Sequence, residues 1–225
     1  MIITIDGPAG AGKSSVSKLL AARLGFEFLD TGAMYRAVTY AAMDSGVSFE
    51  DTEALTQLAS TIQIAFMGKQ VFLDGKDVSE VIRAPEVTRN VSVIADTESI
   101  REHLVRLQRE IAKCGNYVCE GRDQGTVAFP DSPCKFFLTA SAEERAGRRV
   151  QQLRDAGKEA DFEVIVAEQN LRDEQDYNRH VGALKKAHDA IELDTDHKTI
   201  DEVVDEMEMI VLLKMKSLKR QTVSE

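Results

Sequence analysis

The residues best suited to chemistry lie near the start of the chain, in Gly-Pro-Ala-Gly-Ala-Gly-Lys-Ser at 7–14. This run fits the pattern G-x-x-x-x-G-K-[ST], in which a glycine-rich loop turns its backbone N–H groups around phosphate oxygens. In that pattern the lysine reaches the β- and γ-phosphates and the serine hydroxyl binds Mg²⁺, so we assign Ser14 to the metal and expect ATP as the ligand. The residues expected to contact ATP are Gly7, Pro8, Ala9, Gly10, Ala11, Gly12, Lys13, Ser14 and Ser15.

The elements on either side of this loop support the phosphate-binding interpretation. The run Ile-Ile-Thr-Ile-Asp at 2–6 is typical of a buried strand, because it is apolar and rich in β-branched residues. Residues 14–24 then place Val16, Leu20 and Leu24 on one helical face. The alternative is a tight glycine-rich turn that binds nothing, and the strand–loop–helix context argues against it.

Further short strands alternate with helical segments along the rest of the chain. This pattern predicts an α/β fold of the P-loop NTPase type: a five-stranded parallel sheet with helices on both faces. The second and third strands are separated by 31–116, far more than one crossover helix needs. We therefore expect an inserted subdomain that contains a small antiparallel β meander, formed by 62–66 and 71–73. The four strands expected after the first are 26–30, 117–120, 135–139 and 190–194, with a closing helix at 200–214.

The whole chain is expected to form one domain with functional parts. Two helices joined by the polar tip 155–161 are expected to close as a lid. The tail has few apolar residues and is expected to be irregular. The predicted parts are a core of 1–36, 114–148 and 176–214, an acceptor-binding insertion at about 37–113, the lid at about 149–175, and the tail 215–225.

The composition limits the partners of the chain. A net charge of −10 argues against broad nucleic-acid binding, which requires a basic surface. The sequence has neither a charged-then-apolar leader nor an apolar run long enough to span a membrane, so we expect no membrane partner. The three cysteines are odd in number and lack metal-ligand spacing, which indicates reduced thiols in a cytoplasmic protein. No long apolar helix face stands out, and we expect a monomer.

Arginines follow several of the expected strands, where a parallel sheet binds its ligands. Arg36 follows the second strand and Arg122 the third, which predicts contacts to an anionic acceptor beside the triphosphate. Arg148 and Arg172 flank the lid tip and are expected to neutralise charge on the phosphoryl group in transit. For each of these residues the alternative is an ion pair on the protein surface, such as pairing with a nearby glutamate on a helix.

The chain from Ile3 to about Leu213 resembles the bacterial cytidylate kinases, a family of nucleoside monophosphate kinases. The resemblance depends on five segments, of which the second and third are the most specific. They are Ile-Asp-Gly-Pro-Ala-Gly-Ala-Gly-Lys at 5–13, Leu-Asp-Thr-Gly-Ala-Met-Tyr-Arg at 29–36, Glu-Gly-Arg-Asp-Gln-Gly-Thr-Val-Ala-Phe-Pro-Asp at 120–131, Ser-Ala-Glu-Glu-Arg-Ala-Gly-Arg-Arg at 141–149, and Arg-Asp-Glu-Gln-Asp-Tyr-Asn-Arg at 172–179.

The resemblance implies that γ-phosphoryl transfer from ATP, with Mg²⁺, converts CMP or dCMP to the diphosphate. It implies that Thr31, Arg36, Arg122 and Arg179 bind the acceptor phosphate and that Asp123 lies at the ribose. It also implies that Ser92, Arg101 and Asp176 face the cytosine. A carboxylate such as Asp176 accepts from the N4 amine of cytosine, whereas uracil would oppose it with a carbonyl. The residues assigned to charge stabilisation in transit are Lys13, Arg122, Arg148 and Arg172. Glu120 departs from the aspartate often found before Gly-Arg-Asp, and its role is open.

Two other functions remain open at this point. One is a different small-molecule P-loop kinase, acting on another monophosphate or on a sugar-type hydroxyl, which would need a catalytic base near the third strand. The other is a P-loop module that binds nucleotide for regulation or beside nucleic acid. The acidic composition and the lid arginines argue against this module.

Overall fold

The computed structural model describes residues 1–68 and 70–223, and it divides into two compact units. The first unit comprises 1–29 with 115–225, and the second comprises 30–114. None of the helices in the described ranges is both long and apolar enough to cross a membrane. The sequence-based division into core, insertion and lid concerns binding roles, and it stays a prediction.

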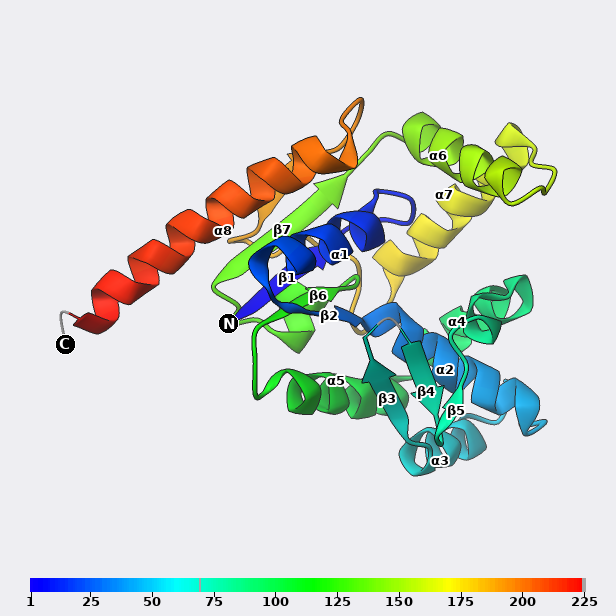
Figure 1. The fold of residues 1–225 in the computed structure, drawn as a ribbon. Helices are drawn as coiled ribbons and strands as arrows, with labels where there is room; N and C mark the ends of the chain where they lie inside the picture. The colour runs from blue at the N-terminus through cyan, green and yellow to red at the C-terminus, as the bar shows by residue number, and fades with distance from the viewer. Residues whose placement is uncertain (69, 224–225) are drawn as a thin grey trace. The chain divides into compact units, whose positions relative to one another are not determined.

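A five-stranded parallel sheet organises the first unit and confirms the predicted fold class (Figure 1). The strand order is β2-β6-β1-β7-β8, so the first strand lies at the centre of the sheet. Ile3 pairs in register with Val118 on one side and with Cys134 on the other. The strands are β1 Ile2–Asp6, β2 Glu27–Asp30, β6 Tyr117–Glu120, β7 Cys134–Thr139 and β8 Ile191–Asp194.

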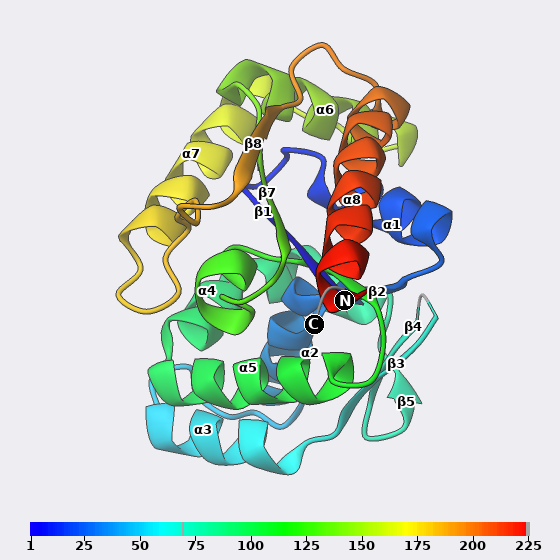
Figure 2. The ribbon, with the colours of Figure 1, turned by 90° about the vertical axis from the view of Figure 1, so that its left-hand side faces the viewer.

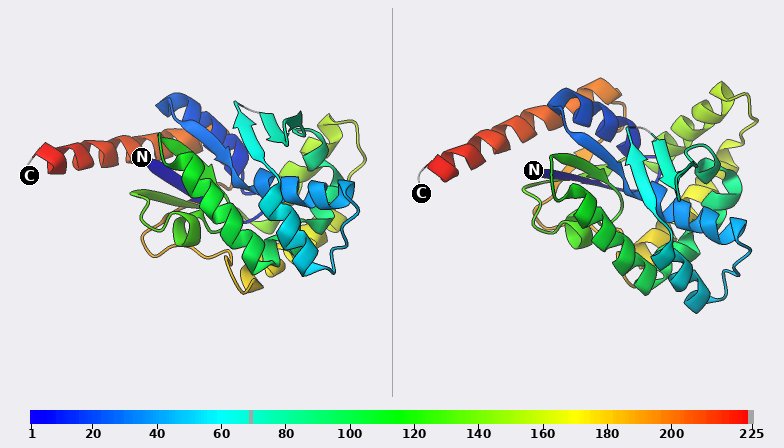
Figure 3. Two further views of the ribbon diagram at one scale, coloured as in Figure 1. Left: turned by 90° about the horizontal axis from the view of Figure 1, so that it is seen from below. Right: turned by 60° about the horizontal axis from the view of Figure 1, so that its bottom comes forward.

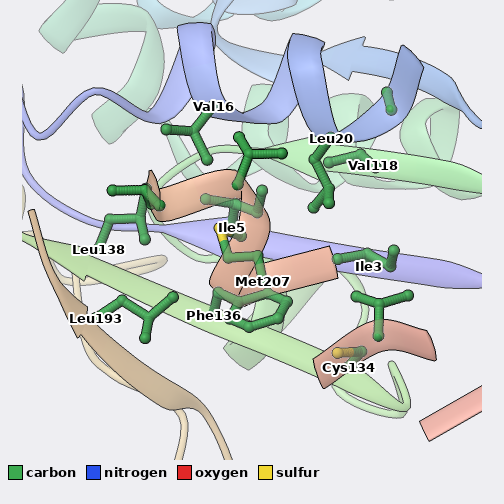
Figure 4. Packing of buried hydrophobic residues seen from close by; sticks show 14 of the residues in the cluster. Ile3, Ile5, Val16, Leu20, Val118, Cys134, Phe136, Leu138, Leu193 and Met207 are labelled. Carbon is green, nitrogen blue, oxygen red and sulfur yellow. The ribbon is translucent and has the colours of Figure 1, made fainter. Parts of the chain in front are cut away.

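Alternation along β1 separates an apolar face from a polar one. Ile3 and Ile5 pack into a buried cluster with the helices α1 (Lys13–Leu24) and α8 (Ile200–Val223), which lie side by side in Figure 2. Figure 4 shows this cluster around Ile5, between Leu20 of α1 and Met207 of α8. Thr4 and Asp6 face the opposite way, toward the short π-helical turn η2 (Gln124–Ala128). The end of β1 therefore brings a carboxylate under the segment that follows β6.

The helix α8 corrects the expectation of an irregular tail. It continues from Ile200 to Val223, whereas the sequence predicted a helix ending at 214 and a loose segment after it. The residues from 215 to 223 include neither glycine nor proline, so nothing in them stops a helix. Met215 is half-buried against the apolar cluster and 216–220 are exposed, so the tail has little to bury, as expected, although it is helical. Residues 224 and 225 of the predicted tail lie outside the described residues.

Two further helices, α6 (Ala142–Asp155) and α7 (Phe162–Asn178), form a hairpin in the first unit. Ser141 caps α6 by accepting from the Glu144 N–H, and Asp161 caps α7 in the same way. A small apolar cluster of Ala146, Val150 and Ile165 holds the two helices together. This hairpin is the segment that the sequence predicted as a lid.

In its described residues the second unit contains the helices α2 to α5 and a small antiparallel sheet, whose strands are labelled β3, β4 and β5 in Figure 1. Figure 3 shows this unit from two further sides. The sheet order β3-β4-β5 confirms the predicted meander. Within the unit α2 packs against α4, and α3 packs against α5. Its elements are α2 Thr31–Asp44, α3 Thr52–Thr61, β3 Ile64–Met67, β4 Gln70–Leu73, β5 Lys76–Asp77, the 3₁₀ turn η1 Val81–Arg83, α4 Pro85–Asp96 and α5 Glu98–Ala112.

Candidate functional site

The loop between β1 and α1 has the backbone that its glycines allow. Gly7 comes so close to β7 that a Cβ placed there would lie 2.2 Å from the Leu138 carbonyl oxygen. Gly10 and Gly12 have φ values of 83° and 84°, the left-handed region that favours glycine. The first turn of α1 has no side-chain cap, so its N–H groups face the loop. Such a concavity of N–H groups at a helix N-terminus binds anions.

Lys13 lies inside this loop with its ammonium folded back onto the backbone. Its Nζ donates to the Pro8 carbonyl oxygen at 2.6 Å, and the side chain is buried. Burial, followed by the nearby Arg122 guanidinium, holds the pKa of Lys13 well below its usual range. Burial and Arg122 thus disfavour the charged form of Lys13, and a bound polyanion would favour it.

Ser14 and Glu120 form a small oxygen cluster next to Lys13. The Ser14 Oγ donates to Glu120 Oε1 at 2.5 Å, and Glu120 is buried at the end of β6. Hydroxyl and carboxylate oxygens are the donors that Mg²⁺ prefers, and Mg²⁺ usually keeps several waters and binds few protein ligands. The described residues contain no cluster of three or more His, Cys, Asp or Glu side chains that could hold a metal alone. This donor set fits Mg²⁺ bound jointly by the protein and by substrate phosphates.

A buried carboxylate holds two of the predicted phosphate-binding arginines. Asp176 accepts from Arg122 Nε at 2.7 Å through Oδ2 and from Arg179 Nη2 at 2.8 Å through Oδ1. Burial alone would raise the pKa of Asp176, but Arg122 and then Arg179 outweigh it and hold the pKa below its usual value. Burial likewise disfavours the charged form of Arg122, yet Asp176 holds the pKa of Arg122 above its usual value. The Asp176 carboxylate and the Arg122 guanidinium therefore stabilise each other's charged forms.

Asp6 organises the segment that follows Arg122 and Asp123, and it was not predicted from the sequence as a site residue. Its carboxylate accepts from the backbone N–H groups of Gln124 at 2.9 Å and Gly125 at 2.7 Å. Burial raises the pKa of Asp6 to about 7, although these two hydrogen bonds oppose the shift. The one available signal was its place at the end of a buried strand, directly before Gly7.

The lid hairpin reaches the phosphate loop through Arg145 and Asp173. Arg145 Nη1 donates to the Ala9 carbonyl oxygen at 2.9 Å and to Asp173 Oδ2 at 2.5 Å. Asp173 Oδ1 accepts from the Ala9 N–H at 3.3 Å. Arg145 and Asp173 lie in the quoted segments 141–149 and 172–179, but no role was predicted for either, because their partners are distant in sequence.

The two predicted lid arginines have different surroundings. Arg148 donates to the Thr195 side chain at 3.0 Å and to its carbonyl oxygen at 2.5 Å. Thr195 in turn donates to Ala11, which ties Arg148 to the phosphate loop through one residue. Arg172 is half-buried, and its positive charge contributes to lowering the pKa of both Lys13 and Asp176. The first unit thus brings Lys13 together with Arg122, Arg172 and Asp176.

The second unit holds the remaining predicted residues. Arg36 Nη2 donates to both carboxylate oxygens of Asp30, at 3.2 and 3.0 Å, and Arg83 donates to Asp30 at 3.4 Å. Asp30 also caps α2 by accepting from the Ala33 N–H. Neither Asp30 nor Arg83 was predicted from the sequence as a site residue. Thr31 is buried in the first turn of α2.

Arg101 is buried on α5, where its guanidinium lies over the Tyr35 ring at 5.3 Å and donates to the Ala95 carbonyl oxygen. Ser92 is half-buried on α4. The assignment of Thr31, Arg36, Ser92 and Arg101 to one acceptor together with Asp176 stays a prediction.

Comparison with known proteins gives a consistent result. The family model described as cytidylate kinase matches residues 3–212. A cytidylate kinase from Rhodopirellula baltica is 51% identical over 94% of this chain and 92% of its own length. One from Caldanaerobacter subterraneus is 48% identical, over 90% and 91% respectively. Among solved structures, a gluconokinase from Sinorhizobium meliloti has a TM-score of 0.52 at 13% identity, covering 97% of this chain and 95% of its own, which supports the fold alone.

Proposed function

Because the chain belongs to the cytidylate kinase family, we propose that it transfers the γ-phosphoryl group of ATP to CMP or dCMP, giving ADP and CDP or dCDP. The observation that carries the proposal is the charge arrangement in the first unit. A loop suited to a triphosphate, with buried Lys13, lies within electrostatic range of Arg122 and Asp176. Phosphoryl transfer needs this combination of positioned phosphates and fixed positive charge.

In this proposal the loop N–H groups and Lys13 hold the β- and γ-phosphates of the donor. Mg²⁺, when bound through Ser14, neutralises charge on the donor phosphates. Because the Ser14 hydroxyl donates its hydrogen bond to Glu120 Oε1, the lone pairs of the serine oxygen are left for the cation. This assigns a role to Glu120: it fixes the rotamer of Ser14.

Asp176 serves the acceptor in two ways in this proposal. Its carboxylate presents about four lone-pair sites, and the two arginines occupy two of them. The remaining sites suit the N4 amine of cytosine, while the held guanidinium groups of Arg122 and Arg179 bind the acceptor phosphate. Ser92 and Arg101 donate to the ring acceptors, Thr31 and Arg36 bind the phosphate end, and Asp123 binds the ribose.

No general base is required for this reaction, because the attacking oxygen belongs to a phosphate that is already ionised at neutral pH. Catalysis then depends on position and charge. Lys13 and Arg122 stabilise the phosphoryl group as it moves, and Arg148 and Arg172 add charge and exclude water when the hairpin closes. We further propose that the protein acts as a cytoplasmic monomer without nucleic-acid or membrane partners.

A panel of acceptors tests the proposal. ADP formation from ATP and Mg²⁺ is measured with CMP, dCMP, UMP, AMP and dTMP, and gluconate serves as a hydroxyl acceptor. The proposal expects CMP and dCMP to have by far the highest kcat/KM. Equal turnover of UMP or AMP would reject cytosine selectivity, and turnover of gluconate alone would reject the monophosphate class.

A further inference from the structure

The base of the lid hairpin meets the phosphate loop at a closed ring of contacts. Arg145 on α6 and Asp173 on α7 bind each other, and each also binds the backbone of Ala9. Arg145 donates to the Ala9 carbonyl oxygen, and Asp173 accepts from the Ala9 N–H group. Both side chains are almost fully buried, at 7% and 11% exposure.

Packing at the next residue supports the same junction. A Cβ on Gly10 would lie 2.9 Å from the Arg145 Cβ and 3.1 Å from Gln169 Nε2. The loop therefore contacts α6 and α7 at Gly10 as well as at Ala9. Gln169 in turn donates to the Arg145 carbonyl oxygen, so the two helices are bonded to each other at the contact.

Stability alone is a poor explanation of this buried ion pair. Removing two charges from water costs several kcal/mol per ion, and apolar residues of similar size often do as well or better. What an apolar pair cannot do is bind both polar groups of one residue. The Arg145–Asp173 pair satisfies the carbonyl and the N–H of Ala9 at once, and it thereby fixes the backbone at the start of the loop.

We propose that Arg145 and Asp173 are positioning residues for the donor nucleotide: together they hold Ala9 so that the loop N–H groups from Gly10 onward stay turned toward the phosphates. The inference rests on the proposed binding of donor phosphates in this loop. It gives the lid hairpin a second task, because the same helices that carry Arg148 and Arg172 also set the shape of the anion cradle. Neither residue of the pair needs to touch the nucleotide.

Charge gives the opposite expectation, which makes the proposal testable. Asp173 places a negative charge beside a site for a polyanion, so its removal should tighten nucleotide binding if charge were its main effect. If positioning dominates, its removal weakens binding instead. The direction of the change in ADP affinity separates the two effects.

The experiment measures ADP and CMP binding by calorimetry, steady-state kinetics and thermal unfolding for Asp173→Ala, Arg145→Met and the double variant. The matched controls are Glu174→Gln and Arg154→Gln, which remove exposed charges from the same two helices. We expect ADP affinity and KM for ATP to worsen about 10- to 100-fold in all three variants, while CMP affinity and both controls stay within about twofold.

The melting temperatures show whether a variant weakens ADP binding by moving Ala9 or by destabilising the whole fold. Each single variant leaves a buried charge unpaired and lowers the melting temperature, whereas the double variant removes both charges and recovers it. Recovered stability with ADP affinity still weak supports positioning. Arg145→Lys is a milder variant, in which we expect partial rescue because one nitrogen, Nη1, makes the contacts to both Ala9 and Asp173, while the bond from Nε to the Ala140 carbonyl oxygen is lost.

Two results would overturn the inference: wild-type ADP affinity in the double variant, or tighter ADP binding by Asp173→Ala. These results are distinguishable from failure of the proposed function. If the wild-type protein did not phosphorylate CMP, the dependence of ADP binding on the pair would still be measurable.

Discussion

Replacing Asp176 with asparagine tests the link between base recognition and the arginines of the site. Both carboxylate oxygens are occupied in the structure, one by Arg122 and the other by Arg179, and the side chain is 8% exposed. Asparagine keeps the shape and one acceptor oxygen, but it turns the other oxygen into an N–H donor. That donor then faces a guanidinium group or the N4 amine of cytosine, and neither can accept from it.

The magnitude follows from the contacts that are lost. A hydrogen bond to a charged group contributes about 1.5–3 kcal/mol, and the loss of one partner in a buried ion pair costs about 3–5 kcal/mol. We expect the unfolding free energy to fall by about 2–4 kcal/mol, since one of the two bonds survives. A mismatched base edge costs about 1–3 kcal/mol, so the ratio of kcat/KM for CMP over UMP should fall roughly 10- to 100-fold.

The assay is the coupled measurement of ADP release with CMP and UMP as acceptors, at saturating ATP and separately at varied ATP. Glu174→Gln is the control, because it removes an exposed carboxylate from the same helix. We expect KM for ATP to change less than the CMP preference. An unchanged CMP-to-UMP ratio beside a lower kcat would show that Asp176 acts through its arginines alone, and equal losses for ATP and CMP would also refute base recognition.

Three further predictions concern the loop and the strand before it. Gly7→Ala puts a Cβ 2.2 Å from the Leu138 carbonyl, so we expect a loss of roughly 3 kcal/mol or more in denaturant unfolding, whereas Gly147→Ala meets no atom within 4 Å and should gain about 0.5–1 kcal/mol. Lys13→Met should lower kcat by roughly two to three orders of magnitude without loss of the melting temperature, because burial already disfavours the ammonium; an unfolded variant would contradict this. The pKa of Asp6 is raised to about 7, so its favourable contribution is full below about pH 4 and is lost as the pH rises to 7. The stability of the wild type relative to D6N should therefore fall by up to about 4 kcal/mol across that window, and a pH-independent difference would refute the assignment.

Much of the fold was predictable because its signals are local. The run at 2–6 is apolar and rich in β-branched residues, and it is the central strand β1 with Ile3 and Ile5 buried. The glycines at 10 and 12 require the left-handed backbone found there. The end of α8 was predicted wrongly, since the expectation rested on the few apolar residues of 215–225, whereas 215–223 contain neither glycine nor proline to stop the helix.

The candidate site was predictable in its residue types but not in its partners. Motifs identified Lys13, Arg122 and Asp176, because short sequence patterns reflect constraints on phosphate binding. The contacts that organise these residues join positions more than 50 residues apart, such as Arg122 with Asp176, or Asp6 with Gln124. No periodicity or spacing in the sequence indicates such a pair. The contacts of Asp6 and Glu120 could therefore be found only in the structure. The functional roles assigned to the motif residues stay predictions.

The helix α7 shows the physical reason for this difference. Its sequence has little amphipathic pattern, and the buried positions of its second half are two carboxylates, Asp173 and Asp176. Three residues on a helix turn about 300° and rise about 4.5 Å, so the two carboxylates lie on neighbouring strips of one face, nearly a turn apart. Burial of both would be prohibitive without fixed cations, and Arg145 meets the first while Arg122 and Arg179 meet the second. The first carboxylate serves the loop and the second the arginines, so a movement of α7 that disturbs one must disturb the other. A shift of the whole helix should therefore change donor and acceptor affinities together, whereas replacing Asp173 alone, which leaves Asp176 and its arginines in place, should change donor affinity only.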